Sequence, residues 1–389
     1  MNNENTRGIV TRLLSAAGIT VNGNNPWDIH VYNEDFYARV LHNGSLGLGE
    51  SYMEGYWDCR QLDDFFYKIL RSNLDKSVRK SLRLKLEILM ARVFNFQKPA
   101  RATRNGQQHY DAGNDLFQHM LDKRLVYTCA FWDGAATLDE AQEHKLDLSC
   151  RKLQLKPGMH VLDIGCGWGS FAKYAAENYG VTVTGITISK EQVSLGQQLC
   201  AGLPVTIRLQ DYRQLNEKFD AIVSLGMFEH VGPHNYHEYM KVAARCLKDN
   251  GLFLLHTIGG NEQHAFTDQW LNKYIFPGAV IPTIRQIGQA LEGIFVMEHW
   301  ENFSVNYDKT LMAWYDNVAA NWDKLKNRYD QTFFRMWKYY LLSCAASFRA
   351  RHSQLWQIVL SKAGIPGGYH FAANQESGNL TLATGTFKP

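Results

Sequence analysis

The fold of this 389-residue chain is decided by the stretch Val161-Leu162-Asp163-Ile164-Gly165-Cys166-Gly167-Trp168-Gly169. An apolar strand ends here in an acidic residue and runs into a glycine turn, which opens a helix. Glycine adopts positive φ angles without strain and lets the backbone approach a ligand closely. A strand, a glycine turn and a helix in this order are typical of α/β sheets that bind nucleotide-like ligands.

From about residue 150 onward, apolar runs alternate with helical segments. The predicted strands are HVLDIG (160–165), VTVTGITIS (181–189), VTIRLQ (205–210), DAIVSLG (220–226) and GLFLLHTI (251–258), and the predicted helices are the segment after residue 169 and KEQVSLGQQLCAG (190–202). This alternation predicts a parallel sheet with right-handed crossovers, hence an α/β fold. Beyond it we expect an irregular insertion or lid over 260–310 and an aromatic-rich helical region over 310–362.

The N-terminal part has a different pattern and is predicted to be a small, mainly helical domain over residues 1–97. Its segment 44–57, GSLGLGESYMEGYW, is glycine-rich and predicts a turn. Residues 76–97 carry an apolar stripe at helical spacing, with Arg and Lys among it. Pro99 and a polar run mark a linker over 98–108. The catalytic domain is then expected to span 109–389.

Composition excludes several classes of protein. With 45% apolar residues the chain can bury a full-sized core, and a net charge of +3 does not suggest a nucleic-acid binder. No apolar run reaches the roughly 18 residues of a spanning helix, and MNNENTRGIVTRLL lacks the apolar core of a signal peptide. We therefore expect a cytoplasmic protein whose membrane contact is peripheral. The seven scattered cysteines, without a CxxC pair, predict reduced thiols and no metal site.

The end of the second predicted strand distinguishes a dinucleotide site from an S-adenosylmethionine site. This strand ends in Thr187-Ile188-Ser189, where a dinucleotide enzyme would place an acidic residue for the ribose. DIGCGWG instead resembles motif I of the class I, Rossmann-like S-adenosylmethionine methyltransferases. By that resemblance Gly165 and Gly167 let the backbone meet the methionine part of the cofactor. Asp163 orders the turn, and Cys166 lies inside it because it is small.

The same resemblance assigns the rest of the cofactor. Thr187 and Gln192 are expected to bind the ribose hydroxyls. Gln210, Asp211 and Tyr212, at the end of the third strand, are expected at the adenine edge, where a carboxylate can accept from the amino group.

Further motifs lie before the predicted sheet, at the ends of its strands and beyond it: HYDAGND (109–115), VYTCAFW (126–132), GMFEHVG (226–232), LLHTIG (254–259), NYD (306–308), TLMAWY (310–315) and SCA (343–345). Together they closely resemble the cyclopropane-fatty-acyl-phospholipid synthase family, relatives of the mycolic acid cyclopropane synthases. The resemblance covers nearly the whole chain and includes 44–57, which the mycolic acid enzymes lack. Thr128 and Phe131 depart mildly from the Ser and Tyr usual there.

The family resemblance implies a reaction. A methylene group is added from S-adenosylmethionine across a cis double bond of a phospholipid acyl chain, through a carbocation that a base deprotonates. Tyr127 and Thr128 are then expected at the methionine end of the cofactor, and Tyr110 near the sulfonium. The implied partner is a bilayer with unsaturated acyl chains, contacted by the N-terminal domain through its basic stripe, which alternatively is only a solvated face. A homodimer contact through that domain is also expected.

In the family the base is bicarbonate. Its binding groups correspond here to the Cys129 backbone, Glu229, His256, the Ile258 backbone and Tyr307. A carboxylate beside an anion suggests that Glu229 accepts the bicarbonate proton or relays it, with His256 as a candidate for the relay. Taken singly, His256 fits an ordinary strand-end histidine, Glu229 a helix cap and Tyr307 a surface tyrosine. Cys344 is a further catalytic candidate, although the chemistry needs no nucleophile and buried cysteine usually serves as a small apolar residue.

Three other functions remain open. The same chemistry in a fatty-acyl methyltransferase would leave a methylene or methyl branch. An RNA or small-molecule methyltransferase would present a base-stacking or nucleophile-binding surface, whereas an enzyme that acts on acyl chains needs an apolar tunnel. A catalytically inactive lipid-binding module would not need the cofactor and bicarbonate motifs.

Overall fold

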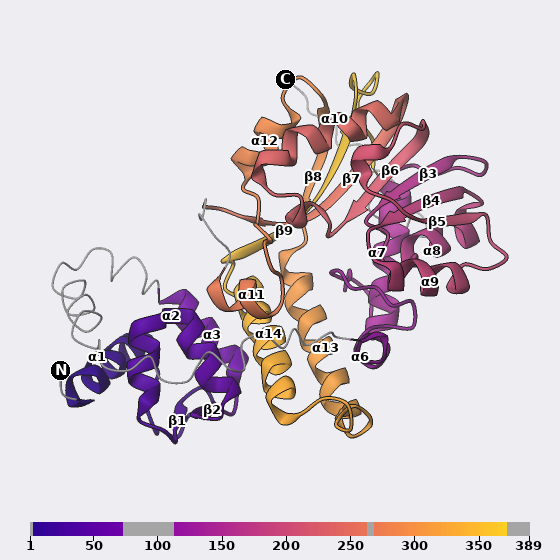
Figure 1. Ribbon diagram of the computed structural model, residues 1–389. Coiled ribbons are helices and arrows are strands. Elements are labelled where there is room, and N and C mark those ends of the chain that lie inside the picture. The colour runs from indigo at the N-terminus through magenta and orange to yellow at the C-terminus, as the bar shows by residue number, and fades with distance from the viewer. Residues whose placement is uncertain (1–2, 73–112, 263–267, 372–389) are drawn as a thin grey trace, which may run out of the picture.

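A seven-stranded sheet forms the centre of the protein. The structure, a computed structural model, describes residues 3–72, 113–262 and 268–371. The strands lie in the order β5-β4-β3-β6-β7-β9-β8 (Figure 1). They are β3 (His160–Ile164), β4 (Thr182–Thr187), β5 (Val205–Leu209), β6 (Phe219–Leu225), β7 (Leu247–Gly260), β8 (Val296–Asn302) and β9 (Ser353–Ser361). Pairing is parallel from β5 to β7, and β9 is antiparallel to both of its neighbours. This confirms the predicted α/β methyltransferase fold.

Helices cover both faces of the sheet. On one side lie α7 (Leu138–Lys152), α8 (Ser170–Tyr179) and α9 (Lys190–Leu199), and on the other α10 (Tyr236–Cys246) and α12 (Ile284–Leu291). Successive strand residues alternate between the two cores, because side chains of a strand point to opposite faces. Val161 thus packs with the α7 and α8 side, and Leu162 with the α10 and α12 side.

Two expectations for the C-terminal half were wrong in part. The region 260–310 is not an irregular insertion, since it holds α11 (Gln269–Tyr274), α12, β8 and the start of α13. The region 310–362 is helical only in α13 (Ser304–Leu325) and α14 (Gln331–Arg349), and it ends in the strand β9. Eight of the nine residues of β9 are buried. A strand covered on both faces lacks the alternation that reveals half-buried strands, so its sequence does not separate it from a buried helix.

The N-terminal part is mainly helical, as predicted. It contains α1 (Asn3–Ala16), α2 (Asp35–Met53), α3 (Leu62–Arg71) and a short hairpin of β1 (Ile29–Val31) and β2 (Trp57–Cys59). The predicted turn at 44–57 is wrong over most of its length, because α2 continues through it with a kink at Gly44 (φ 57°, ψ −128°). The other glycines serve packing: a Cβ on Gly49 would lie 2.3 Å from the Trp270 ring.

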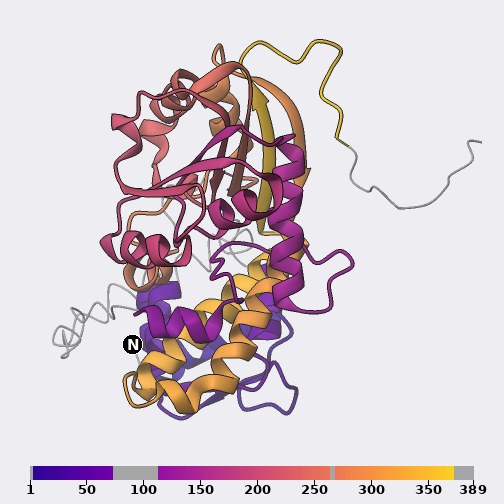
Figure 2. The same cartoon turned by 90° about the vertical axis from the view of Figure 1, so that its right-hand side faces the viewer.

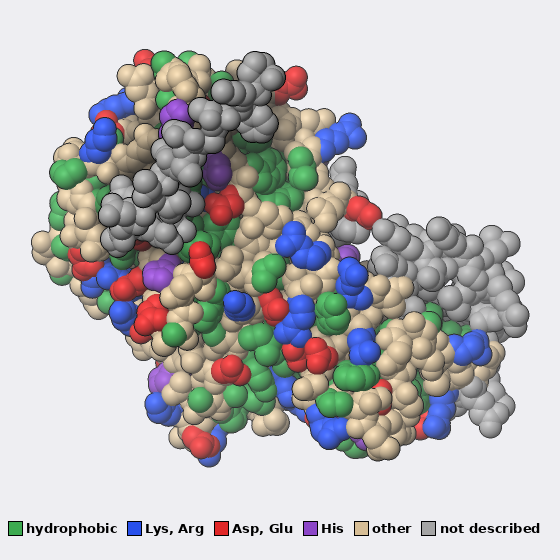
Figure 3. All heavy atoms as spheres, turned by 180° about the vertical axis from the view of Figure 1, so that it is seen from behind, with side chains coloured by type: hydrophobic (Ala, Val, Ile, Leu, Met, Phe, Trp, Pro, Cys, Tyr) green, Lys and Arg blue, Asp and Glu red, His purple; other side chains and the backbone are tan. Residues whose placement is uncertain are grey.

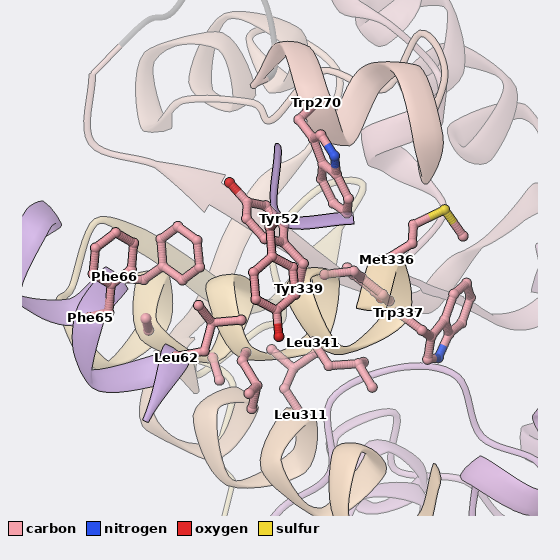
Figure 4. Close-up of a cluster of buried hydrophobic side chains, with 14 of the residues drawn as sticks. Tyr52, Leu62, Phe65, Phe66, Trp270, Leu311, Met336, Trp337, Tyr339 and Leu341 are labelled. Carbon is pink, nitrogen blue, oxygen red and sulfur yellow. The ribbon is translucent and has the colours of Figure 1, made fainter. Parts of the chain in front are cut away.

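One hydrophobic cluster joins this part to α13 and α14. Tyr339 of α14 contacts Tyr52, Phe66 and Trp270 with ring centroids 4.4–5.7 Å apart (Figure 4). Figures 1 and 2 place these helices together beneath the sheet. Arg349 adds a polar connection, since its guanidinium bonds Asp63 of α3 and Asp308 of α13. Removing residues 1–97 would therefore uncover part of a shared core. The division into 1–97, 98–108 and 109–389 stays a prediction. The predicted stripe at 76–97 and the predicted linker at 98–108 both lie outside the described residues.

We expect Gly49→Ala to destabilise the protein by about 1–3 kcal/mol, because the added methyl group would overpack the contact between α2 and Trp270. Gly288→Ala is the matched control. It is also a helical glycine, but its Cβ would have no neighbour within 4 Å, so it should be neutral or slightly stabilising. Urea denaturation midpoints measure both. Equal midpoints for the two variants would contradict the packing role of Gly49.

Candidate active site

A cavity of about 650 Å³ lies at the carboxyl ends of β3, β4, β5 and β6. Parallel strands bring their carboxyl ends to one edge of the sheet, which is where such folds bind ligands. The cavity brings together every predicted cofactor residue that the structure describes: Tyr127, Thr128, Asp163, Gly165, Cys166, Gly167, Thr187, Gln192, Gln210, Asp211 and Tyr212. Tyr110 lies outside the described residues.

The glycine turn has the geometry that its sequence predicts. Gly165, Gly167 and Gly169 all adopt positive φ angles, of 82°, 56° and 84°. The backbone N–H groups of Gly165 and Cys166 both donate to Ile186 O at 3.0 Å, which holds the turn against β4. A Cβ on Gly167 would meet no atom within 4 Å. The turn therefore leaves open space at Gly167 for a ligand.

The polar groups of the cavity are partly engaged with one another. The Thr187 hydroxyl donates to Gln192 Oε1 at 2.6 Å. Asp211 forms an ion pair with Arg213 at 2.6 Å, which lowers the pKa of its carboxyl. Arg213 also lines the cavity and was not anticipated from the sequence. The Asp211 carboxylate can accept from an adenine amino group while it keeps this ion pair, since it has several lone pairs.

A buried lysine lies beneath the methionine end of the predicted cofactor site. Lys145 of α7 is fully buried, lines the cavity and donates to Thr128 Oγ1 at 2.9 Å. Burial lowers its pKa to about 8. The nearby Asp163 is also buried, which raises its pKa to about 7 against the opposing effect of Lys145. Burial thus moves both pKa values toward neutral pH, because it disfavours the charged form of each side chain.

A second group of polar residues follows β6 and β7. Glu229 is in the short 3-10 helix Phe228–His230, and His256 is in β7; they are 5% and 1% exposed. Glu229 Oε1 accepts from Ile258 N at 2.5 Å, and the His256 Nδ1 is 3.1 Å from Gln357 Nε2. Glu229 Oε2 and His256 Nε2, by contrast, have no hydrogen-bond partner among the described residues. Buried polar atoms are usually paired, and this carboxylate oxygen and this imidazole nitrogen are available to bind a small polar ligand.

Tyr307 and two cysteines lie near this group. Burial raises the pKa of Tyr307 well above its usual range. Four nearby groups raise this pKa further: Cys129, Tyr127, Glu229 and Cys344. The structure therefore brings Tyr307 close to the predicted site and does not leave it as an isolated surface tyrosine. The Ile258 backbone was predicted to contact the ligand, and in the structure its N–H donates to Glu229.

Cys344 is poorly suited to act as a nucleophile. Burial raises the pKa of its thiol to about 12, and only the thiolate is strongly nucleophilic. Cys129 is completely buried, and its Sγ donates to Ala130 O at 3.2 Å. Both thiols thus fit the apolar wall of the site.

Sequence reasoning missed Lys145 and Lys152, although a signal was present. Both lie on one stripe of α7 with Ala141 and Leu148, at spacings of four, three and four residues, and all four are buried. Lysines at apolar positions of a helical stripe are unusual, because burying an unpaired charge is costly. Such a pattern indicates polar partners in the interior.

Known proteins resemble this chain over most of its length. A family model described as mycolic acid cyclopropane synthetase matches residues 97–358. The cyclopropane-fatty-acyl-phospholipid synthase of Escherichia coli strain K12 is 54% identical over 369 residues, which are 95% of this chain and 96% of that protein. A crystal structure of a mycolic acid cyclopropane synthase complexed with SAH and CTAB is 34% identical, with a TM-score of 0.61 over 66% of this chain and 97% of that one. Coclaurine N-methyltransferase has a TM-score of 0.63 over 81% of this chain and 99% of its own; at 20% identity it shows a shared fold alone.

We expect Gly167→Val to weaken S-adenosylmethionine binding at least about tenfold, because a branched side chain at positive φ would strain the turn and enter the cavity. Gly202→Val is the matched control. Gly202 also has a positive φ, of 81°, and free space around its Cβ, but it is not part of the cavity wall. Isothermal titration calorimetry compares the two. Wild-type affinity in Gly167→Val would contradict the assignment of the turn to the cofactor.

Proposed function

This chain belongs to the mycolic acid cyclopropane synthetase family and is an S-adenosylmethionine-dependent enzyme, and we propose that it adds a methylene group to the cis double bond of an unsaturated phospholipid acyl chain, forming a cyclopropane ring. One observation carries the proposal: beside the cofactor cavity, whose wall includes Met227 and His230, the buried Glu229 Oε2 and His256 Nε2 have no hydrogen-bond partner among the described residues. The similarity to the Escherichia coli cyclopropane-fatty-acyl-phospholipid synthase supports the choice of substrate.

The reaction requires close alignment and the exclusion of water. The methyl donor and the alkene must approach to about 3–3.5 Å, and water must not reach a carbocation. Tyr127, which lines the cofactor cavity, packs on Trp314 with centroids 5.2 Å apart and shares a 2.9 Å hydrogen bond with the Tyr340 hydroxyl. Trp314 in turn lies 6.0 Å from Tyr307. Aromatic side chains of α13 and α14 thus lie beside Tyr127 at the cofactor cavity, and their faces can stabilise a nearby cation.

The unpaired atoms fit bicarbonate in particular. Bound S-adenosylmethionine would supply an electrophilic methyl group and bound bicarbonate a weak base. Bicarbonate carries one O–H, which suits the acceptor Glu229 Oε2, and anionic oxygens, which suit an N–H of His256. Glu229 and His256 would hold it, with Tyr307 and the backbone at Cys129 as further predicted contacts. The proton that the transferred carbon loses on ring closure needs a final acceptor among the protein side chains, beyond the bicarbonate base. We assign this role to Glu229.

The location of this chemistry at a bilayer is also a proposal. No helix among the described residues has the length and apolar character to cross a membrane. On the face shown in Figure 3, Lys and Arg side chains lie mainly over the helical half and alternate with acidic ones. The basic stripe at 76–97, proposed to contact anionic lipid, lies outside the described residues. Peripheral binding to the inner face of the membrane and homodimer formation rest on the family resemblance.

The direct test of the function is to incubate the protein with labelled S-adenosylmethionine and unsaturated phospholipid vesicles and to analyse the lipid by NMR. Cyclopropane proton signals are the expected result. A methylene or methyl branch would favour the fatty-acyl methyltransferase alternative, and unlabelled lipid would contradict both.

We expect Glu229→Gln to slow turnover roughly ten- to a hundredfold, since a hydrogen bond to a charged group contributes about 1.5–3 kcal/mol. Wild-type turnover should fall in carbon-dioxide-depleted buffer and recover when bicarbonate is added. Glu292→Gln, an exposed position at the end of α12, is the control and should leave the rate unchanged. A wild-type rate that ignores bicarbonate, together with near-normal activity of Glu229→Gln, would overturn this mechanism.

The pH dependence offers an independent check on Glu229. Burial raises its pKa to about 7, so the carboxylate that can accept a proton forms only as the pH rises through that value. We therefore expect kcat/KM to increase with pH through about 7 and to level off above it. Asp163 also has a pKa of about 7, but it belongs to the cofactor cavity. Measured with saturating cofactor, the step should disappear in Glu229→Gln; its persistence there would assign it to another group.

A further inference from the structure

We infer that Gln357 and Lys152 are positioning residues that hold the proton of His256 on Nε2, so that the imidazole offers an N–H to an anion in the pocket. The inference rests on the proposed function, because it concerns the same pocket. It adds two residues from β9 and α7, neither of which touches the ligand site directly.

The three strands at this side of the sheet align the residues in one row. The β7–β9 register pairs His256 with Gln357, and the β8–β9 register pairs Gln357 with Glu301. Lys152, from the last turn of α7, reaches this row with its Nζ 2.7 Å from Gln357 Oε1 and 2.5 Å from Glu301 Oε2. Gln357 Nε2 is 3.1 Å from His256 Nδ1. Gln357 and Lys152 are both completely buried, so no solvent competes for these hydrogen bonds.

The chemistry of the donors sets the direction of the chain of hydrogen bonds. An ammonium group has three donors and no acceptor, so Gln357 must turn its carbonyl oxygen toward Lys152. The Glu301 carboxylate keeps Lys152 in this charged form. The amide NH₂ of Gln357 then faces His256 and donates to Nδ1. This assignment follows from the lysine and does not depend on which way the amide is drawn.

The proton of His256 is thereby placed on the other nitrogen. Burial, followed by the charges of Lys145 and Lys152, lowers the pKa of His256 well below its usual range, so the ring is neutral and carries one proton. Because Nδ1 accepts from Gln357, that proton lies on Nε2, the atom without a partner. In this tautomer Nε2 carries an N–H that can donate to a bound anion, and Nε2 has no lone pair with which to accept a proton. A proton relay through His256 is therefore disfavoured, and Glu229 is left as the acceptor.

The test replaces the amide with a carboxylate of the same shape. In Gln357→Glu the side chain can only accept, which draws the His256 proton to Nδ1 and turns the Nε2 lone pair toward the anion. The half-saturating bicarbonate concentration should rise roughly ten- to a hundredfold, while S-adenosylmethionine affinity stays unchanged. The ¹⁵N shifts of the His256 ring, assigned against a His256→Gln spectrum, should report the tautomer change without any ligand.

A second variant guards against loss of folding. Gln357→Glu places two carboxylates beside one buried lysine, and combining it with Glu301→Gln restores one acid and one base. Both variants should show the changed tautomer. Gln354→Glu is the matched control, since Gln354 lies on the same strand but bonds Asn302, Ser304 and Arg351 instead of a histidine. It should keep the wild-type tautomer and bicarbonate response.

The two readouts separate the inference from the proposed function. An Nε2–H tautomer that persists in Gln357→Glu and in the double variant would overturn the positioning role, whatever the rates. A changed tautomer with an unchanged bicarbonate response would overturn the role of the His256 N–H in anion binding. A wild-type rate that is indifferent to bicarbonate would overturn the proposed base, and the ring shifts would still decide the positioning role.

Discussion

The site depends on one constraint, the parallel pairing of the five neighbouring strands β5, β4, β3, β6 and β7. Strands that run in one direction end at one edge, so groups from β3, β4, β5, β6 and β7 meet there although they are far apart in the chain. The glycine turn follows β3, Thr187 ends β4, and Glu229 follows β6. The same arrangement of strands thus positions the residues of the cofactor cavity and, beside them, Glu229 and His256. The antiparallel β9 adds what the parallel strands cannot, a side chain at mid-strand next to His256.

The interior of the site is polar to a degree that needs explanation. Lys145, Lys152, Glu229 and His256 are all buried, and unpaired buried charges are costly. Part of this cost is offset by hydrogen bonds: Lys152 bonds Glu301 and Gln357, and Lys145 bonds Thr128. Glu229 Oε2 and His256 Nε2 have no partner among the described residues. A carboxylate oxygen and an imidazole nitrogen left open beside the cofactor cavity are consistent with a site for a small anion.

The helical half of the molecule contributes the apolar surroundings. α13 and α14 carry the aromatic residues beside Tyr127 and Tyr307, and the same helices pack against α2 and α3. The N-terminal part is therefore joined to the wall of the site through one hydrophobic cluster. Changes in its packing are expected to reach the site through α14, because a close-packed interior transmits small displacements.

The sequence by itself determined the features that depend on local pattern. The glycine turn and the alternating strands and helices were predicted because each is encoded within a few neighbouring positions. The roles of the cofactor residues at the strand ends came from the resemblance to methyltransferase motifs. The resemblance of short motifs also brought Glu229, His256 and Tyr307 to one site. The helical course of α2 through its glycines was not predictable locally, because Gly49 is required by Trp270, more than 200 residues away.

Only the tertiary structure decided the partners of the buried groups. Residues 353–361 were predicted to be helical, since a strand buried on both faces shows no alternation, and Gln357 therefore had no visible relation to His256, 101 residues earlier. Lys145 and Lys152 stood on a buried helical stripe, but nothing in the sequence indicated which groups would compensate their charges. The protonated nitrogen of His256 depends on a hydrogen-bond direction that begins at Lys152 and Glu301. Such a direction is a property of three elements in contact, α7, β8 and β9, and it exists only when they are packed together.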